Sequence, residues 1–104
     1  MRKNKAAISL ASSAIADLQD ILAYYDSQAI PEVGQRLVAE LLAAIELLAT
    51  QPVMGRKVPE FDLDFLRELI RPPFRIVYRH DPDAVRVVRV WRSERLLILP
   101  EDYE

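Results

Sequence analysis

The sequence predicts an α+β fold of order β-α-α-β-β-β, in which a hairpin of two helices packs on one face of a small, mainly antiparallel sheet. Two observations predict it. Apolar residues recur at helical spacing through two stretches of the first half, and three apolar-rich runs of strand length follow residue 65. The length of 104 residues is typical of a single domain, here residues 1–104. The tail of that domain, residues 96–104, is expected to be flexible or to form an interface.

Residues 5–10 are expected to form a short first strand, and two helices follow it. Ser12 or Ser13 is the expected N-cap of the first helix, over residues 12–27. The apolar stripe of this helix consists of Ile15, Leu18, Ile21, Leu22 and Tyr25. The second helix begins at Pro31, a residue suited to a first helical turn, and its stripe consists of Val33, Leu37, Leu41, Ile45 and Leu48. Because few residues separate the helices, they should form an antiparallel hairpin.

The second half of the chain has the pattern of a loop followed by strands. Residues 53–64 are expected to form the loop, and the three strands are expected at residues 65–71, 74–80 and 84–91. The sequence "HDPD" at residues 80–83 favours a turn that joins the last two strands into a hairpin. Alternation along the middle strand sends Phe74, Ile76 and Tyr78 to one face and Arg75, Val77 and Arg79 to the other. The simplest interpretation of these arginines is a solvated face that discourages aggregation.

Arginine is concentrated in the predicted strands. Eight arginines lie between residues 67 and 95, against four carboxylates, in a chain of net charge −2. A local basic surface is compatible with an acidic protein. The overall charge argues against strong non-specific binding to DNA, and no specific DNA binding by the chain alone is predicted.

Composition bounds the remaining function classes. The chain has no cysteine and a single histidine, His80, which is interpreted as a hairpin residue. No metal site and no cofactor are therefore predicted. No apolar run approaches the roughly 20 residues of a membrane span, and the first residues lack the apolar stretch of a secretion signal. A cytoplasmic protein without membrane contact is expected.

Four segments carry a resemblance to a known family when their order and spacing are taken together. They are "AIADLQDILAYY" at 14–25, "LLAAIELLATQPVMGRKVPE" at 41–60, "LRELIRPPFRIVYR" at 66–79 and "VRVVRVWRSER" at 85–95. Over about residues 8–95 the chain resembles the ParE/RelE toxin superfamily of bacterial type II toxin–antitoxin systems. The leucine-arginine-glutamate-leucine run followed by "FRIVYR" resembles the ParE branch. The resemblance implies a toxin that a cognate antitoxin protein neutralises.

The resemblance also implies two alternative activities. ParE-like members are described as inhibitors of DNA gyrase, and RelE-like members cut mRNA on the ribosome. RNA cleavage needs groups that move protons and cations that stabilise the phosphate. In the RelE pattern Arg75 matches an arginine and Arg95 approximately matches a later one, but Leu66 and Glu68 occupy the lysine positions. Tyr103 lies beyond the expected tyrosine, and Arg92 stands where many relatives carry a histidine.

No catalytic residue is therefore predicted, and gyrase is favoured as the target over the ribosome and mRNA. An inert module that only binds an antitoxin remains a third interpretation. The candidates for binding the target or the antitoxin are Arg56, Lys57, Arg75, Arg79, Trp91, Arg92 and Arg95. The acidic C-terminal part of the antitoxin is expected to meet the arginine-rich sheet and a groove around Trp91. Residues 96–100, "LLILP", are expected to pair as an edge strand or to cover a groove between helices and sheet.

Overall fold

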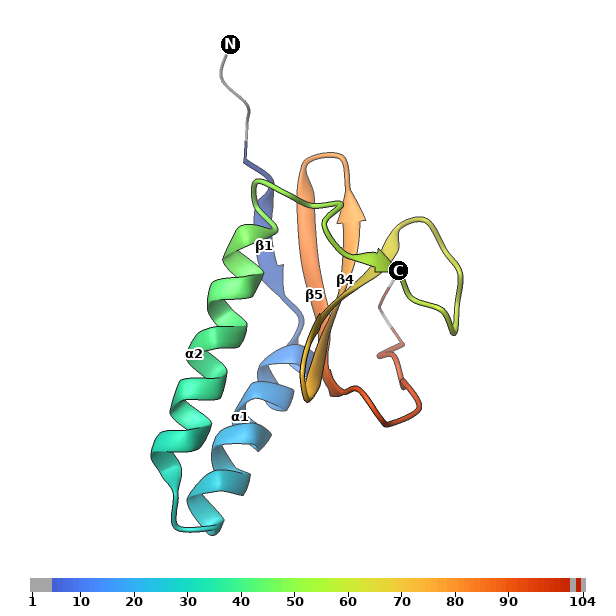
Figure 1. Cartoon of the computed structure of the whole chain (residues 1–104). Coiled ribbons are helices and arrows are strands. Elements are labelled where there is room, and N and C mark those ends of the chain that lie inside the picture. Colours follow the sequence, from blue (N-terminus) through green and yellow to red (C-terminus); the bar gives the residue numbers. More distant parts are fainter. Residues whose placement is uncertain (1–4, 102, 104) are drawn as a thin grey trace.

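The computed structural model describes residues 5–101 and Tyr103. Its elements in chain order are β1 (Ala7–Leu10), α1 (Ser12–Ser27), α2 (Pro31–Leu47), β2 (Arg56–Lys57), β3 (Leu66–Arg71), β4 (Phe74–Asp81) and β5 (Ala84–Arg92). The two helices lie side by side on one side of the sheet (Figure 1). The predicted α+β fold and the predicted order of elements are confirmed, with β2 as an addition. Neither helix is long and apolar enough to cross a membrane.

The five strands have the spatial order β1-β5-β4-β3-β2. β1 runs parallel to β5, and every other neighbouring pair is antiparallel. The strand β2 was not predicted, because it lies inside the segment that the sequence analysis assigned to a loop. Two residues are too few for side-chain alternation to be visible in a sequence. This short strand places Arg56 opposite Glu68 at the edge of the sheet.

The start of α1 differs from the prediction. Ala11 occupies the N-cap position, and no side chain bonds to the free amides of the first turn. Ser13 instead donates its hydroxyl hydrogen to the carbonyl oxygen of Val88, 2.6 Å away. The expectation that Ser12 or Ser13 caps the helix is wrong, because the connection between β1 and α1 holds Ser13 against β5.

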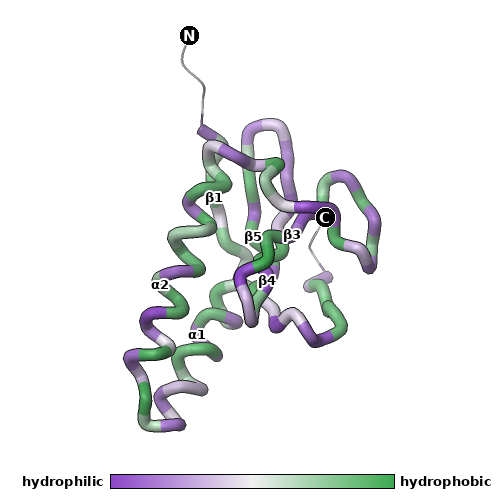
Figure 2. Tube along the Cα trace, in the orientation of Figure 1, coloured by the Kyte–Doolittle hydropathy of each residue, from purple (hydrophilic) through white to green (hydrophobic). Residues whose placement is uncertain are grey.

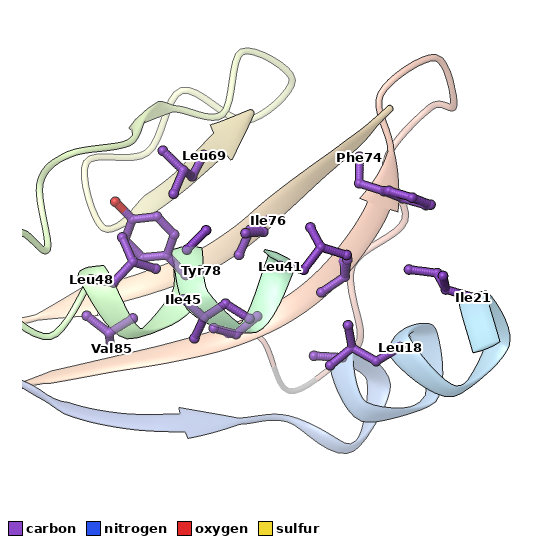
Figure 3. Close-up of a cluster of buried hydrophobic side chains, with 14 residues drawn as sticks. Leu18, Ile21, Leu41, Ile45, Leu48, Leu69, Phe74, Ile76, Tyr78 and Val85 are labelled. Carbon is purple, nitrogen blue, oxygen red and sulfur yellow. The ribbon is translucent and has the colours of Figure 1, made fainter. Parts of the chain in front are cut away.

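The hydrophobic core between the helices and the sheet contains most of the apolar residues predicted for both layers, but Ile15 and Leu22 of the stripe predicted for α1 are 45% and 36% exposed. Leu18 and Ile21 of α1 and Leu41 and Ile45 of α2 face Ile76 and other residues of the strands (Figure 3). Figure 2 shows that hydrophobic and hydrophilic residues alternate along both helices. This helix-side core fixes the end of α1 against β5, where the groove described below lies.

The hairpin of β4 and β5 is confirmed, but β4 extends to Asp81, so the connecting loop is Pro82 and Asp83 alone. β5 contains a bulge. Val77 pairs with Arg89 and Tyr78 pairs with Val87, which leaves one extra residue in β5. Beyond the bulge, Val90 packs in the helix-side core and Trp91 packs on the opposite face of the sheet.

That opposite face has a hydrophobic core of its own, which we call the second core. Its buried residues are Val58, Leu66, Val77, Val88 and Leu97. Residues 93–101, which we call the C-terminal strap, pass over this face on the side away from the helices (Figure 1). Residues 96–100 form no strand, and they cover the far face of the sheet rather than a groove between helices and sheet. Both expectations for this segment are therefore wrong, because Leu97 is apolar and the far face of the sheet offers it apolar partners.

Candidate interaction surface

A groove of about 470 Å³ opens between α1 and the C-terminal end of β5. Four aromatic side chains line it, namely Tyr24, Tyr25, Phe74 and Trp91. Three arginines, two aspartates, Ile21 and Val90 complete its surface. Aromatic and arginine side chains are the types most often found at the energetically important centres of protein interfaces. The composition of this groove is therefore that of a protein-binding site.

On the helix side of the groove, two tyrosines end the first helix. Their rings meet edge to face, with centroids 5.0 Å apart and planes at 87°. Tyr25 is partly buried against the helix-side core, whereas Tyr24 is 56% exposed. One tyrosine therefore anchors the helix and the other offers an open aromatic surface.

On the strand side of the groove, two arginines lie close to the ring of Trp91, the single tryptophan of the chain. The Arg89 guanidinium lies 4.0 Å from the centroid of the Trp91 ring, and that of Arg95 lies 6.0 Å away. The Arg92 guanidinium lies 5.5 Å from the Phe74 ring. Each of these distances allows a cation–π attraction. The arginines therefore contact two of the four aromatic rings that line the groove, those of Trp91 and Phe74.

A bidentate ion pair connects α1 to β5 at the floor of the groove. The two oxygens of Asp17 accept hydrogen bonds from Nε and Nη2 of Arg89 at 2.8 and 2.6 Å. The Oδ2 atom of Asp17 also accepts the amide of Val90 at 2.9 Å, just beyond the bulge. The Asp17 carboxylate lies on the buried face of α1. Arg89 neutralises its charge, and both of its oxygens accept hydrogen bonds. It fixes the position of Arg89, and through it that of Trp91.

Most of the charge in and beside the groove is internally balanced. Arg92 donates to Oε2 of Glu94 at 2.7 Å, and this bond raises the pKa of Arg92 and lowers that of Glu94. Asp17 balances Arg89 in the same way. Within residues 5–101 and Tyr103, Arg95 has no carboxylate partner within ion-pair distance. Among the described residues it is the one arginine lining the groove without such a partner.

Arg75 lies on the far face of the sheet, but it is only 5% exposed. Its guanidinium donates to Glu68 at 2.9 Å and to Glu60 at 3.0 and 2.7 Å. Glu68, 1% exposed, also accepts a hydrogen bond from Nε of Arg56 at 2.8 Å, and Nη2 of Arg56 lies 2.8 Å from the same oxygen. The expectation of a solvated arginine face is wrong at Arg75, because the loop that carries Glu60 and the C-terminal strap cover it.

The carboxylate of Glu60 is held in its ionised form. Its hydrogen bonds from Arg75 lower its pKa from 4.5 to about 2. Desolvation by the surrounding chain acts in the opposite direction and is the smaller effect. Glu60 and Glu68 together surround one guanidinium with two carboxylates, so Arg75 is left with little attraction for a further anion.

The remaining candidates lie apart from the groove. Arg79 pairs with Asp81 at 3.0 Å and lies over the Phe65 ring. Lys57 of β2 pairs with Asp64 at 3.0 Å. The predicted residues therefore divide among four locations: Trp91, Arg92 and Arg95 lie in the groove, Arg56 and Arg75 lie on Glu68, and Lys57 and Arg79 each lie in a separate pair.

Sequence reasoning missed three residues that shape these sites, namely Asp17, Glu60 and Arg89. One of them left a signal. Asp17 falls between Ala14, Leu18 and Ile21 on the buried face of α1, where a carboxylate needs a cationic partner. Glu60 lies in an irregular loop, and nothing in its neighbours indicates that it meets Arg75.

The C-terminal strap is held to the sheet by side chains. Arg75 donates to the carbonyl of Arg95 at 3.1 Å, and Trp91 Nε1 donates to that of Leu96 at 3.2 Å. The amide of Leu97 donates to Glu60 at 3.4 Å, and Arg89 donates to the carbonyl of Ile98 at 3.2 Å. Four consecutive residues of the strap, 95–98, are thus fixed by side chains that line the groove or by Arg75 and Glu60.

The family described as "ParE toxin of type II toxin-antitoxin system, parDE" matches residues 8–97. No curated protein matches the chain. The chain is similar in structure to one from the chromosomal ParDE toxin–antitoxin system of P. aeruginosa, with TM-score 0.72, 22% identity, 88% of this chain and 100% of the other covered. It is also similar to a chain of the RelBE2 toxin–antitoxin complex of Mycobacterium tuberculosis, with TM-score 0.64, 19% identity and coverage of 86% and 99%.

At these identities the two structures establish the shared fold alone. The family match is of a different kind, since it spans both helices and all of the sheet except the first residue of β1. The chain belongs to the ParE toxin family of type II toxin–antitoxin systems.

Proposed function

We propose that this chain is a toxin that inhibits DNA gyrase, that it does not cut RNA, and that a separate antitoxin chain neutralises it. The observation that supports the choice of gyrase inhibition over RNA cleavage is the burial of Arg75 between Glu60 and Glu68. An arginine that contacts a scissile phosphate must be open to solvent and free of competing carboxylates. Arg75 meets neither condition.

Among the described residues, the positions that the RelE pattern uses for proton transfer carry other side chains or side chains already held by partners. Leu66 is fully buried in the second core, and Glu68 is bonded to two arginines. These are the positions at which the RelE pattern has lysines. Tyr103 packs beside Phe61, with ring centroids 6.3 Å apart, and Arg92 is paired with Glu94. Arginine stays protonated at neutral pH, so it cannot act as a general base.

The antitoxin is proposed to bind in the groove between α1 and β5. The P. aeruginosa and M. tuberculosis neighbours belong to toxin–antitoxin assemblies, which supports a partner of this kind. The groove offers the open ring of Tyr24 and the ring of Trp91 to an apolar side chain. Arg95 offers a cation to a carboxylate. A partner segment with an apolar anchor next to an acidic residue matches this surface.

Expression in bacterial cells tests the proposed target. We expect DNA synthesis, followed by labelled thymidine, to fall before protein synthesis, followed by labelled methionine, and we expect the DNA-damage response and filamentation. Co-expression of the small protein encoded beside the toxin gene should restore both signals. Immediate arrest of methionine incorporation would favour mRNA cleavage instead. Normal growth at full expression of folded chain would favour the inert module.

A further inference from the structure

We infer that the C-terminal strap forms the second half of the antitoxin-binding surface, with Leu96 and Ile98 as its apolar contacts and Arg95 as its charged contact. The inference rests on the proposed function, because it names further residues for the proposed antitoxin. It assigns to the strap a role that its packing in the second core does not require.

The exposure of the strap alternates along its sequence. Leu96 is 79% exposed and Ile98 is 62% exposed, whereas Leu97 between them is 6% exposed. Leu97 and Leu99 pack in or against the second core. Burial of those two residues secures the strap but leaves Leu96 and Ile98 in water. Two large apolar side chains that face solvent on one short segment are typical of an interaction site.

The strap presents these side chains from a fixed position. Its backbone bonds to Arg75, Trp91, Glu60 and Arg89 hold residues 95–98 one after another. A partner that binds a segment already held in place loses less conformational entropy than one that must order it. The exposed leucine and isoleucine are therefore arranged for contact at low entropic cost.

The strap is continuous with the groove. Trp91 and Arg89 both line the groove, and they donate to the carbonyls of Leu96 and Ile98 respectively. Arg95, the first of the four fixed residues, lines the groove as well. A partner segment that leaves the groove past Trp91 meets the strap next. One extended partner therefore reaches both surfaces without a gap.

The charge of Arg95 favours an antitoxin segment over a second copy of this chain. A symmetric dimer with its two-fold axis at the straps would bring Arg95 near Arg95 of the partner. That arrangement places like charges together in the interface, and like charges disfavour association. A segment with two apolar side chains and a carboxylate matches Leu96, Ile98 and Arg95 without this cost.

The test is a binding titration with the purified small protein encoded beside the toxin gene, labelled with a fluorophore and followed by anisotropy. The test variant is Leu96→Ser with Ile98→Ser in the full chain. The matched control is Leu47→Ser with Val53→Ser, which removes two apolar side chains that are 45% and 62% exposed outside the groove and the strap. Urea unfolding midpoints equal to that of the parent chain establish that both variants are folded.

We expect the strap variant to bind roughly 10- to 100-fold more weakly than the parent, because two apolar contacts are lost, and the control to bind within about twofold. Arg95→Glu should also weaken binding. Equal affinity of the strap variant and the parent overturns the inference and leaves the proposed function intact. Absence of binding by the parent overturns the proposed antitoxin, and the inference with it. A parent dimer in sedimentation that the strap variant abolishes, at unchanged antitoxin affinity, also overturns the inference.

Discussion

Arg75 and Glu68 form a buried ion pair on neighbouring strands, with 2.9 Å between Nη1 of the arginine and Oε1 of the glutamate. Both side chains are almost fully removed from water. A buried pair of this kind contributes little net stability when intact, but removal of one partner leaves an uncompensated charge. Arg75 is therefore committed to the structure of the protein, which is why we assign it no role in phosphate chemistry.

Replacement of Arg75 by methionine tests this commitment. The change leaves Glu68 buried with Arg56 as its cation, so we expect the free energy of unfolding to fall by about 3–5 kcal/mol. The matched control is Arg79→Met, which breaks the more exposed pair with Asp81 and should cost less than about 1 kcal/mol. Urea denaturation followed by circular dichroism measures both. Equal costs for the two changes would contradict the structural role of Arg75.

The stability of the protein should depend on pH through Glu60. Its folded-state pKa, about 2, lies below the unfolded value near 4.5, so the folded state binds fewer protons in that range. The contribution is fully present above about pH 5 and is lost as pH falls towards 2. The side chain is 27% exposed and therefore screened, so we expect a loss of about 1 kcal/mol.

Glu60→Gln isolates this effect, because a neutral amide cannot titrate. The variant should be less stable than the parent at pH 7, and the difference should shrink below pH 4. Glu94→Gln, at an exposed carboxylate, is the control. It should change neither the stability at pH 7 nor the dependence of stability on pH appreciably. Thermal unfolding across pH 3–7 supplies the measurement. A constant difference between Glu60→Gln and the parent over that range would contradict the prediction.

The two glycines of the chain should respond differently to alanine. At Gly55 a Cβ atom would lie 2.5 Å from the backbone oxygen of Glu68 and 2.7 Å from the hydroxyl of Tyr78, so we expect a loss of about 2 kcal/mol or more. At Gly34 the nearest atom is Cβ of Tyr25 at 3.0 Å. There the crowding opposes a gain of about 1 kcal/mol in helix propensity, so the net change should be small.

Urea titrations of the two alanine variants decide this comparison. A larger loss at Gly34 than at Gly55 would show that the loop before β2 yields more easily than the helix pair. Such a result would contradict a rigid position of Arg56 opposite Glu68, because that loop leads directly into β2.

Asp17→Asn should loosen the floor of the groove. The asparagine keeps an oxygen for the amide of Val90 but loses the charge that balances Arg89, so we expect a loss of about 2–4 kcal/mol. Fluorescence of Trp91, the single tryptophan, should shift because Arg89 lies over its ring. Asp20→Asn, also at the groove, is the control and should leave the fluorescence unchanged. An unchanged spectrum for a folded Asp17→Asn variant would contradict the link between α1 and Trp91.

The fold was predictable from the sequence because its elements are long and periodic. The apolar stripes of α1 and α2 and the alternation along β4 persist over enough residues to identify each element. The two residues of β2 are too short for such a pattern. The bulge in β5 is likewise invisible, since a run rich in valine gives no sign of the position at which one residue is unpaired.

The candidate site was predictable only in part. Alternation correctly placed Arg75 on the face away from the helices, but it does not reveal what covers that face. The cover comes from Glu60 and Leu97, which are distant in sequence and lie in irregular segments. The groove around Trp91 depends on the position of α1 relative to the bulge, a tertiary relationship that local patterns do not encode. Local sequence patterns therefore do not predict contacts between irregular segments that are distant along the chain.

The proposed gyrase inhibition is tested most directly by DNA supercoiling with purified gyrase, ATP and relaxed plasmid, titrated with the purified chain. The same preparation is added to ribosomes programmed with a defined mRNA. We predict that supercoiling falls as the chain is added, that the purified antitoxin restores it, and that the mRNA stays intact. Cleavage of the mRNA in the ribosomal A site with normal supercoiling would contradict the account, because it would require a catalytic role on the face where Arg75 is buried.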